Sequence, residues 1–238
     1  MIPSHDIKRL SQVSSEFLQW LSGFVDSEGN FLISPDAKGN VAFRFRIRLH
    51  KDDLSALEYI KFMLGVGIIR IEGNSAIYII SKLKDLIEII VPLFSTYPLL
   101  STKNLDFESF KQALDIKNKS NTSKLNLEDL KFIIDIKSSM NRNRIENKLT
   151  LPEIISSNLR SSTKINIYWL LGFVEGDGTF GIKNLVPYFQ VAQHNKNIFV
   201  LNLVKDFLVK LAIDSSIPNG VTPLNSISIF TNKKNKCL

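Results

Sequence analysis

The sequence predicts an α+β protein made of two pseudo-symmetric units, each with the element order α-β-β-α-β-β-α. The main observation is a repeat: residues 20–33 recur as residues 169–182, with 8 of the 14 aligned positions identical. Each copy ends a run of apolar residues at helical spacing and leads into a segment with strand character. Because an internal repeat indicates copies of one structural unit, we expect a first unit at 1–116, a connector at 117–165 and a second unit at 166–238.

The elements of the first unit follow from spacing and turn residues. A helix is expected at 15–28, with Ser14 or Ser15 as its N-cap and Gly29 as a left-handed residue at its C-terminal end. Strict alternation of apolar and polar residues marks a strand at 41–49. The same criteria place strands at 31–34, 68–71 and 76–80, and helices at 52–64, 83–94, 105–116 and, within the connector, 127–140.

The second unit repeats this order only in part. A helix with Asn166 as its N-cap and ending at Gly178 comes first. It is followed by a strand, a turn at Pro187, and then a strand at 188–193, a helix at 196–211 and strands near 216–217 and 226–230. By alignment with the first unit, the second is expected to lack its last two helices. A large buried side chain contributes roughly 1.5–3 kcal/mol, so we expect a marginally stable second half with a partly uncovered sheet.

Composition indicates a globular protein with a polyanionic partner. Apolar residues make up 44% of the chain and charged residues 22%, which excludes wholesale disorder. The net charge of +7 favours a nucleic-acid partner without establishing one. No apolar run reaches the roughly 20 residues of a membrane span, and the first residues resemble neither a signal peptide nor a presequence. Cys237 is the single cysteine, so an internal disulfide and a cysteine-based zinc site are excluded.

Each repeated stretch ends a helix with two carboxylates in its last turn. The C-terminus of a helix already carries partial negative charge and unpaired carbonyls, so an acid there is disfavoured by about 0.3–1 kcal/mol. A hard divalent cation such as Mg²⁺ would favour this arrangement of oxygen ligands. Gly23 and Gly172 would allow the two helices to approach closely, which would bring Glu28 and Asp177 side by side. The alternative is that the glycines merely permit packing and the acids lie on an ordinary surface.

The strand at 41–49 would supply a basic surface. Arg44, Arg46 and Arg48 alternate with apolar residues and therefore share one face. Arginine contacts phosphate and pairs with guanine in the major groove, although such a row can also be an ordinary polar face. The corresponding strand of the second unit has no charge, and there Gln190 either contacts a base edge or is a neutral exposed residue.

Residues 21–29 (LSGFVDSEG) and 170–178 (LLGFVEGDG) resemble the two motifs of the LAGLIDADG homing endonucleases, in the single-chain form with two repeats. The resemblance implies motif helices packed between two antiparallel sheets that lie on DNA. It also implies Mg²⁺-dependent cleavage of both strands of a long duplex, with water as the nucleophile. Glu28 and Asp177 would each bind Mg²⁺, assisted by the backbone carbonyls of Ser27 and Gly176.

The resemblance extends to other site residues. Asp26 and Glu175 would be the less critical first acids of each motif. Gln193 and Lys103 correspond to positions near the attacking water, whereas Leu49, at the position equivalent to Gln193, could not act there. Members of the family are commonly encoded within organellar introns, which implies a mitochondrial protein, and the single-chain form implies a monomer.

Two other functions remain open from the sequence. One is an RNA-binding maturase that assists the intron and needs the basic surface without the acids. The other is an inactive remnant, which the expected lack of the last helices would explain. The presence of both second acids, Glu28 and Asp177, favours the nuclease, because a protein that only binds nucleic acid has no need for an electrostatically costly pair.

Overall fold

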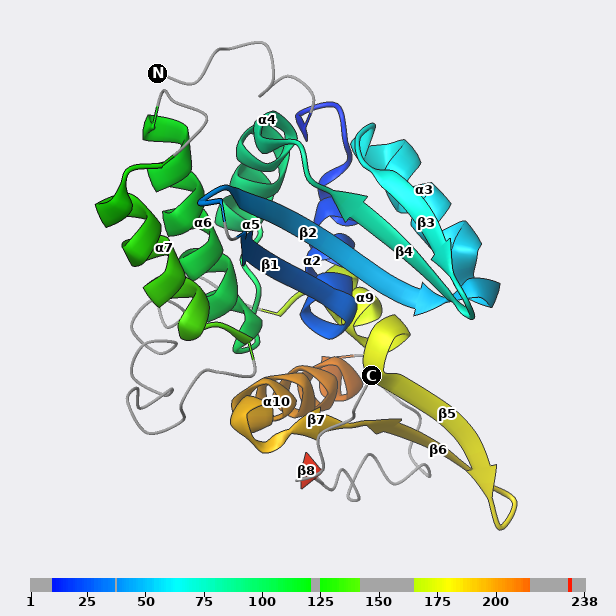
Figure 1. The fold of residues 1–238 in the computed structure, drawn as a ribbon. Coiled ribbons are helices and arrows are strands. Elements are labelled where there is room, and N and C mark those ends of the chain that lie inside the picture. Colours follow the sequence, from blue (N-terminus) through cyan, green and yellow to red (C-terminus); the bar gives the residue numbers. More distant parts are fainter. Residues whose placement is uncertain (1–9, 37, 121–124, 142–164, 215–230, 233–238) are drawn as a thin grey trace.

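The computed structural model describes residues 10–36, 38–120, 125–141, 165–214 and 231–232. The strands expected near 216–217 and 226–230 lie outside the described residues. Within the described part of the chain, helices and antiparallel sheets form two halves on either side of a central helix pair (Figure 1). None of the helices among these residues is long and apolar enough to cross a membrane.

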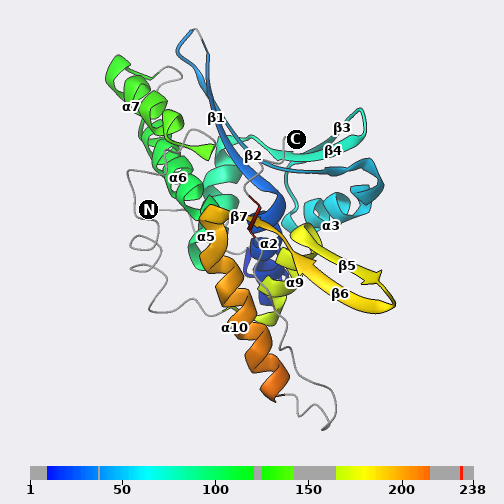
Figure 2. The same cartoon turned by 90° about the horizontal axis from the view of Figure 1, so that it is seen from below.

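The central pair consists of α2 (Ser15–Glu28) and α9 (Ile167–Asp177). Side-chain oxygens of Ser14 and Asn166 accept hydrogen bonds from the first turns, so each helix begins at a polar N-cap. A Cβ at Gly23 would collide with the carbonyl oxygen of Trp169, and a Cβ at Gly172 would collide with that of Trp20. This reciprocal contact confirms that the two motif helices pack through their glycines across a pseudo-two-fold axis, and two views show them side by side (Figure 2).

The first half contains a four-stranded antiparallel sheet in the order β1-β2-β4-β3. Its strands are β1 (Gly29–Pro35), β2 (Val41–His50), β3 (Ile68–Glu72) and β4 (Ser75–Ile80). After β2, a short 3₁₀ turn (η1, Lys51–Asp53) leads into α3 (Leu54–Leu64), which ends at Gly65 in the left-handed conformation, with φ +67°. One face of the sheet is buried because alternate residues of β1 and β2, among them Phe31 and Phe45, point into the core.

Helices cover the buried face of this sheet. The segment after β4 is one continuous helical run: α4 (Leu83–Asp85), a π-helical turn (η2, Leu86–Ile90) and α5 (Val91–Thr96). The π turn ends two residues before Pro92, which cannot donate a backbone hydrogen bond. Two further helices, α6 (Lys103–Lys119) and α7 (Leu127–Ser138), complete the core. Four phenylalanines from three of these elements, Phe31, Phe94, Phe107 and Phe110, pack ring against ring there.

The second half is smaller within the described residues. It contains a ribbon of β5 (Gly178–Lys183) and β6 (Val186–Val191), then β7 (Gln193–His194), a 3₁₀ turn (η5, Asn195–Asn197), α10 (Ile198–Asp214) and β8 (Thr231–Asn232), which pairs in parallel with β7. The ribbon matches β1 and β2 in register, since Gly29 faces Ile47 and Gly178 faces Val191. Phe180, however, is 74% exposed, whereas its counterpart Phe31 is fully buried.

The structure corrects three details of the sequence prediction. Gly29 has φ −75°, so it is extended rather than left-handed; a glycine is needed because a Cβ would lie 2.9 Å from the carbonyl oxygen of Val25. The hairpin turn of the second half lies at Asn184 and Leu185, both with positive φ, and Pro187 belongs to β6. The helix expected at 105–116 begins two residues earlier, at Lys103.

Candidate active site at the paired helix ends

The C-terminal ends of α2 and α9 meet, and each ends in a half-buried acid, Glu28 and Asp177 respectively. Ser27 Oγ donates a 2.9 Å hydrogen bond to the carbonyl oxygen of Phe173 on the other helix. A Cβ at Gly176 would lie 2.9 Å from Ser27 Oγ and 3.3 Å from Glu28 Cγ. The backbone of Gly176 therefore lies against the side chains of Ser27 and Glu28, at the level of the two acids.

A lysine lies between these helix ends. Lys103 Nζ donates hydrogen bonds to the carbonyl oxygens of Val25 at 2.8 Å and of Ser27 at 3.0 Å. Burial lowers the pKa of Lys103, while the nearby carboxylates, including Asp177 and Glu28, oppose that shift. The ammonium thus offsets the negative end of α2, which the sequence alone left unbalanced.

Asp177 is held by a side chain from β7. Gln193 Nε2 donates a hydrogen bond to Asp177 Oδ2, and Gln193 Oε1 accepts one from Asn197 Nδ2 at 2.8 Å. Asn197 Oδ1 in turn accepts a 3.0 Å hydrogen bond from the backbone N–H of Thr102, the residue before Lys103. Sequence reasoning did not identify Asn197, because a single asparagine in a polar stretch carries no pattern.

The first acids of the two motifs have structural partners. Asp26 is buried, and its carboxylate accepts hydrogen bonds from the backbone of Leu100 (2.7 Å), from both N–H and O–H of Ser101 (3.0 and 2.6 Å), and from Trp169 Nε1 (3.1 Å). Burial raises the pKa of Asp26, and these donors oppose the rise.

Glu175 accepts a 2.8 Å hydrogen bond from Trp20 Nε1, so each first acid binds the tryptophan of the other helix. The sequence contained the signal for this pairing, because a tryptophan begins both repeats, but its partner could be assigned only in three dimensions.

The predicted arginine row lies on the open face of the large sheet. Arg44, Arg46 and Arg48 alternate with the buried residues of β2. Arg48 forms a 3.5 Å salt bridge with Glu72 of β3, and Arg44 Nη1 lies 3.4 Å from Ser34 Oγ. The face is therefore not uniformly positive, since one arginine has an acidic neighbour.

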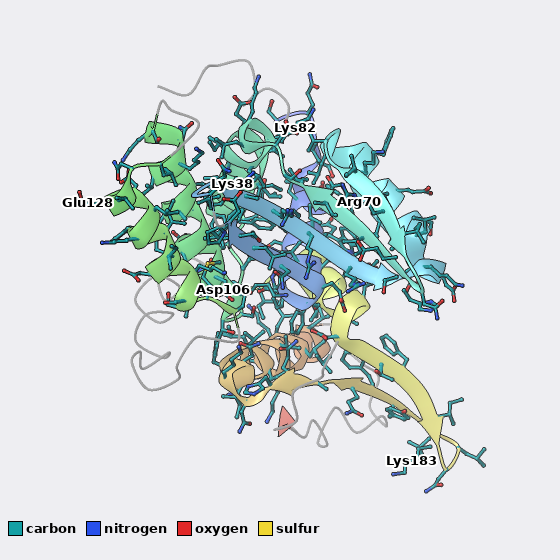
Figure 3. All side chains as sticks on the ribbon, viewed as in Figure 1. Lys38, Arg70, Lys82, Asp106, Glu128 and Lys183 are labelled. Carbon is teal, nitrogen blue, oxygen red and sulfur yellow. The ribbon has the colours of Figure 1, made fainter. Side chains whose placement is uncertain are left out.

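Arg70 is a fourth arginine on this face, which the sequence analysis did not identify. Ile77 of β4 lies between two arginines, because it pairs with Arg48 of β2 on one side and with Arg70 of β3 on the other. Directly opposed residues of paired strands point to the same face of the sheet. Figure 3 labels Arg70 on the large sheet and Lys183 at the tip of the β5–β6 ribbon. On that ribbon, exposed Gln190 occupies the register position of Arg46.

Comparison with known proteins matches this geometry to one family. The sequence profile of the LAGLIDADG endonuclease family matches residues 21–114. The structure of the meganuclease I-AabMI bound to uncleaved DNA superimposes with a TM-score of 0.64 and 32% identity, over 80% of this chain and 72% of the other. The chain belongs to the LAGLIDADG homing endonuclease family.

Other known proteins are similar to most of this chain. I-SmaMI bound to cleaved DNA gives a TM-score of 0.64 at 25% identity, over 80% of this chain and 71% of the other. The mitochondrial protein RF1 of Saccharomyces cerevisiae is 32% identical over 81% of this chain and 39% of its own length. A probable intron-encoded endonuclease of Schizosaccharomyces pombe, Cox1-I1b, is 28% identical over 93% of this chain and 57% of its own. The chain thus spans roughly half the length of these two relatives.

The LAGLIDADG motif ends have a donor set that suits Mg²⁺. Within the described ranges, no group of three or more His, Cys, Asp or Glu side chains lies close enough to hold a metal. Mg²⁺ does not need such a group, because it is typically bound by one or two carboxylates and completes its shell with water and phosphate oxygens. Glu28, Asp177 and the carbonyl of Ser27, which has a second lone pair beside its bond to Lys103, are hard oxygen donors of this kind.

Proposed function

We propose that this chain is a site-specific DNA endonuclease that cleaves both strands of a long duplex in a reaction that requires Mg²⁺. One observation carries the proposal: two carboxylates, Glu28 and Asp177, end paired helices around one half-buried lysine, Lys103. Such an arrangement concentrates hard oxygen ligands and one cation at a single point. The DNA-bound structures of I-AabMI and I-SmaMI support the same substrate class.

Each side chain of the site has a role in this proposal. Glu28 and Asp177, with the carbonyls of Ser27 and Gly176, would hold Mg²⁺, which would lower the pKa of a bound water and neutralise charge on the phosphate. Lys103 would stabilise the negative charge that develops on the phosphate. Its ammonium lies near the two carboxylates that would hold the metal, and a charge acts more strongly in a partly dehydrated site.

Gln193 orients the carboxylate of Asp177 through one Nε2 hydrogen, and its second Nε2 hydrogen can orient the attacking water. Leu49 has no polar group with which to do this in the first half.

The sheet surfaces would bind the DNA. The open face of the large sheet carries four arginines, namely Arg44, Arg46, Arg48 and Arg70, and the ribbon presents Gln190. Two sheets in one chain give a monomer the reach for a long asymmetric target. We also propose a mitochondrial location, since RF1 carries that description and Cox1-I1b is named as intron-encoded.

The function is tested by cleavage of a library of random-sequence DNA duplexes in the presence of Mg²⁺. We expect the wild-type protein to cut both strands of a selected sequence and to lose this activity when EDTA is added. The double variant Glu28→Gln/Asp177→Asn should bind the selected duplex without cutting it, because the amide side chains keep the shapes of the two acids but remove their negative charges. Tight binding to intron RNA without any DNA cleavage would instead indicate a maturase and contradict the proposal.

A further inference from the structure

Asn197 is a buried side chain that connects the two halves of the site. It is the last residue of η5 and only 7% exposed. Its Nδ2 donates to Gln193 Oε1 of the second half, and its Oδ1 accepts from the N–H of Thr102 in the first half. A buried amide with both ends engaged is costly to replace, since its removal would leave two buried polar groups without this partner.

The direction of this hydrogen-bond chain is determined by the backbone of Thr102. A backbone N–H can only donate, so the atom that faces it must be an acceptor. Asn197 must therefore turn its oxygen to Thr102 and its nitrogen to Gln193, and Gln193 must then turn its nitrogen to Asp177. The amide of Asn197 consequently determines which end of Gln193 faces the acid.

Asn197 also stabilises the helix that carries Lys103. The first N–H groups of a helix lack partners within the helix, and Thr102, the N-cap of α6, has no side-chain capping bond of its own. Asn197 accepts the hydrogen bond of Thr102, and Ser101 Oγ accepts that of Lys103 at 3.2 Å. The start of α6 is therefore held by a residue of the other half.

Among the residues that the structure describes, the first half shows no equivalent of this connection. His50 and His194 occupy equivalent places, because the Nδ1 of each faces the backbone N–H two residues later, at 3.5 and 3.3 Å. Counting from these histidines, Asn197 corresponds to the exposed residue Asp53, and Gln193 corresponds to Leu49. The asparagine is thus a feature of one half-site and not of the repeated fold.

We propose that Asn197 is a positioning residue, which orients Gln193 on Asp177 and at the same time holds the start of α6, and hence Lys103, beside the two acids. The inference rests on the proposed nuclease function for its effect on cleavage. Its structural content, a hydrogen bond between the halves, can be measured whether or not the chain cuts DNA.

The experiment compares Asn197→Asp with Asn197→Ala. Aspartate still accepts the Thr102 N–H but cannot donate to Gln193 Oε1, whereas alanine does neither. Hydrogen exchange of the Thr102 amide, followed by NMR on the metal-free protein, should therefore stay slow in the aspartate variant and become at least about tenfold faster in the alanine variant. Equal exchange in wild type and the alanine variant would overturn the inference, and so would loss of protection in the aspartate variant.

Cleavage of each labelled strand provides the second readout. The DNA strand that Asp177 serves is identified as the strand whose cleavage is slowed most by Asp177→Asn. Asn197→Asp should slow that strand by roughly 10–100-fold, the usual effect of losing a partner that orients a metal ligand, with little change in duplex affinity. Asp53→Asn, the matched control in the first half, should leave both rates unchanged.

A double variant separates an action through Gln193 from a general loss of packing. If Asn197 acts through Gln193, Gln193→Leu/Asn197→Asp should cut no more slowly than Gln193→Leu alone. Multiplied effects of the two substitutions would contradict the proposal. If the wild-type protein cuts no DNA, the proposed function fails, and the exchange of the Thr102 amide still decides whether Asn197 joins the halves.

Discussion

Single residues set how closely the two halves approach. Gly23 and Gly172 lie where any side chain would overlap a carbonyl of the opposite helix, and Ser27 bridges the tips with its hydroxyl. The first acids then differ in environment: Asp26 is buried among four donors, whereas Glu175 is exposed and accepts a hydrogen bond from the indole of Trp20. The acids at equivalent positions of the two motifs, Asp26 and Glu175, should therefore contribute differently to stability.

Gly172→Ala should be strongly destabilising. Its Cβ would overlap the carbonyl oxygen of Trp20, so the helices must move apart, and overpacking of this kind costs about 1–3 kcal/mol. Urea denaturation measures the change in the free energy of unfolding. Leu171→Ala, at a half-exposed neighbouring position, is the control and should cost less; equal stability of Gly172→Ala and wild type would contradict the close approach.

Asp26→Asn and Glu175→Gln should differ in their effect on stability. An asparagine at position 26 would direct an NH2 group either at the N–H of Ser101 or at the N–H groups of Leu100 and Trp169, so we expect a loss of about 1–3 kcal/mol. Glutamine at position 175 keeps an oxygen for Trp20 at an exposed site and should cost less than about 1 kcal/mol. Urea denaturation of both variants checks this order, and a larger loss for Glu175→Gln would reverse the interpretation.

The strands of the large sheet determine which charged side chains share its open face. The alternation of β2 buries three apolar side chains and leaves Arg44, Arg46 and Arg48 on the opposite face. Pairing with β4 and β3 then brings Arg70 onto the same face and Glu72 beside Arg48. An arginine with an acidic neighbour is restrained, whereas Arg46 lies in the middle of the row.

Arg46→Ala should relax the preference for one base pair by about 1–3 kcal/mol if Arg46 contacts a guanine edge. Affinity for the selected duplex and for its single-base variants, measured over a range of salt concentrations, tests this expectation. An equal loss of affinity for all sequences, with a reduced dependence on salt, would show that Arg46 contacts phosphate alone.

The described part of the molecule is asymmetric in its burial. Among the described residues, the core cluster of the first half contains 29 buried apolar residues, and the cluster around α9 and α10 contains 7. Phe180 and Ile182 of the ribbon are each 74% exposed, although their counterparts in the first half are buried. The repeat therefore preserves the helix pair better than it preserves the two cores.

We expect the second half to unfold before the first. Within the described ranges, fewer buried apolar side chains stabilise it. Amides of α10 and the β5–β6 ribbon should therefore exchange faster than those of β2 and β4, and they should lose protection at lower urea concentration. Native-state hydrogen exchange measures this directly. A single cooperative transition at high temperature, with uniform protection across both halves, would show the prediction to be wrong.

The sequence by itself determined the repeat, the order of the main elements within the described residues and the pairing of Glu28 with Asp177 at the helix ends. Helical and strand spacing are local patterns, and two copies of one motif leave few alternatives for how they pack. The arginine row of β2 was predictable for the same reason. Two details of the prediction were wrong: Gly29 is extended because it already pairs with Ile47 as the first residue of β1, and the turn lies at Asn184 and Leu185.

Only the tertiary structure decided which groups stabilise the helix ends. Lys103 reaches carbonyls at positions 25 and 27, Trp169 reaches Asp26, and Asn197 joins Thr102 to Gln193, each across a long stretch of chain. The residues that form these hydrogen bonds show no periodic pattern in the sequence, because the packing of α2 against α9 determines which groups come within reach of one another. The sequence therefore specified the acids and, by resemblance, Lys103 and Gln193, whereas only the fold showed which groups these two bind and that Asn197 belongs with them.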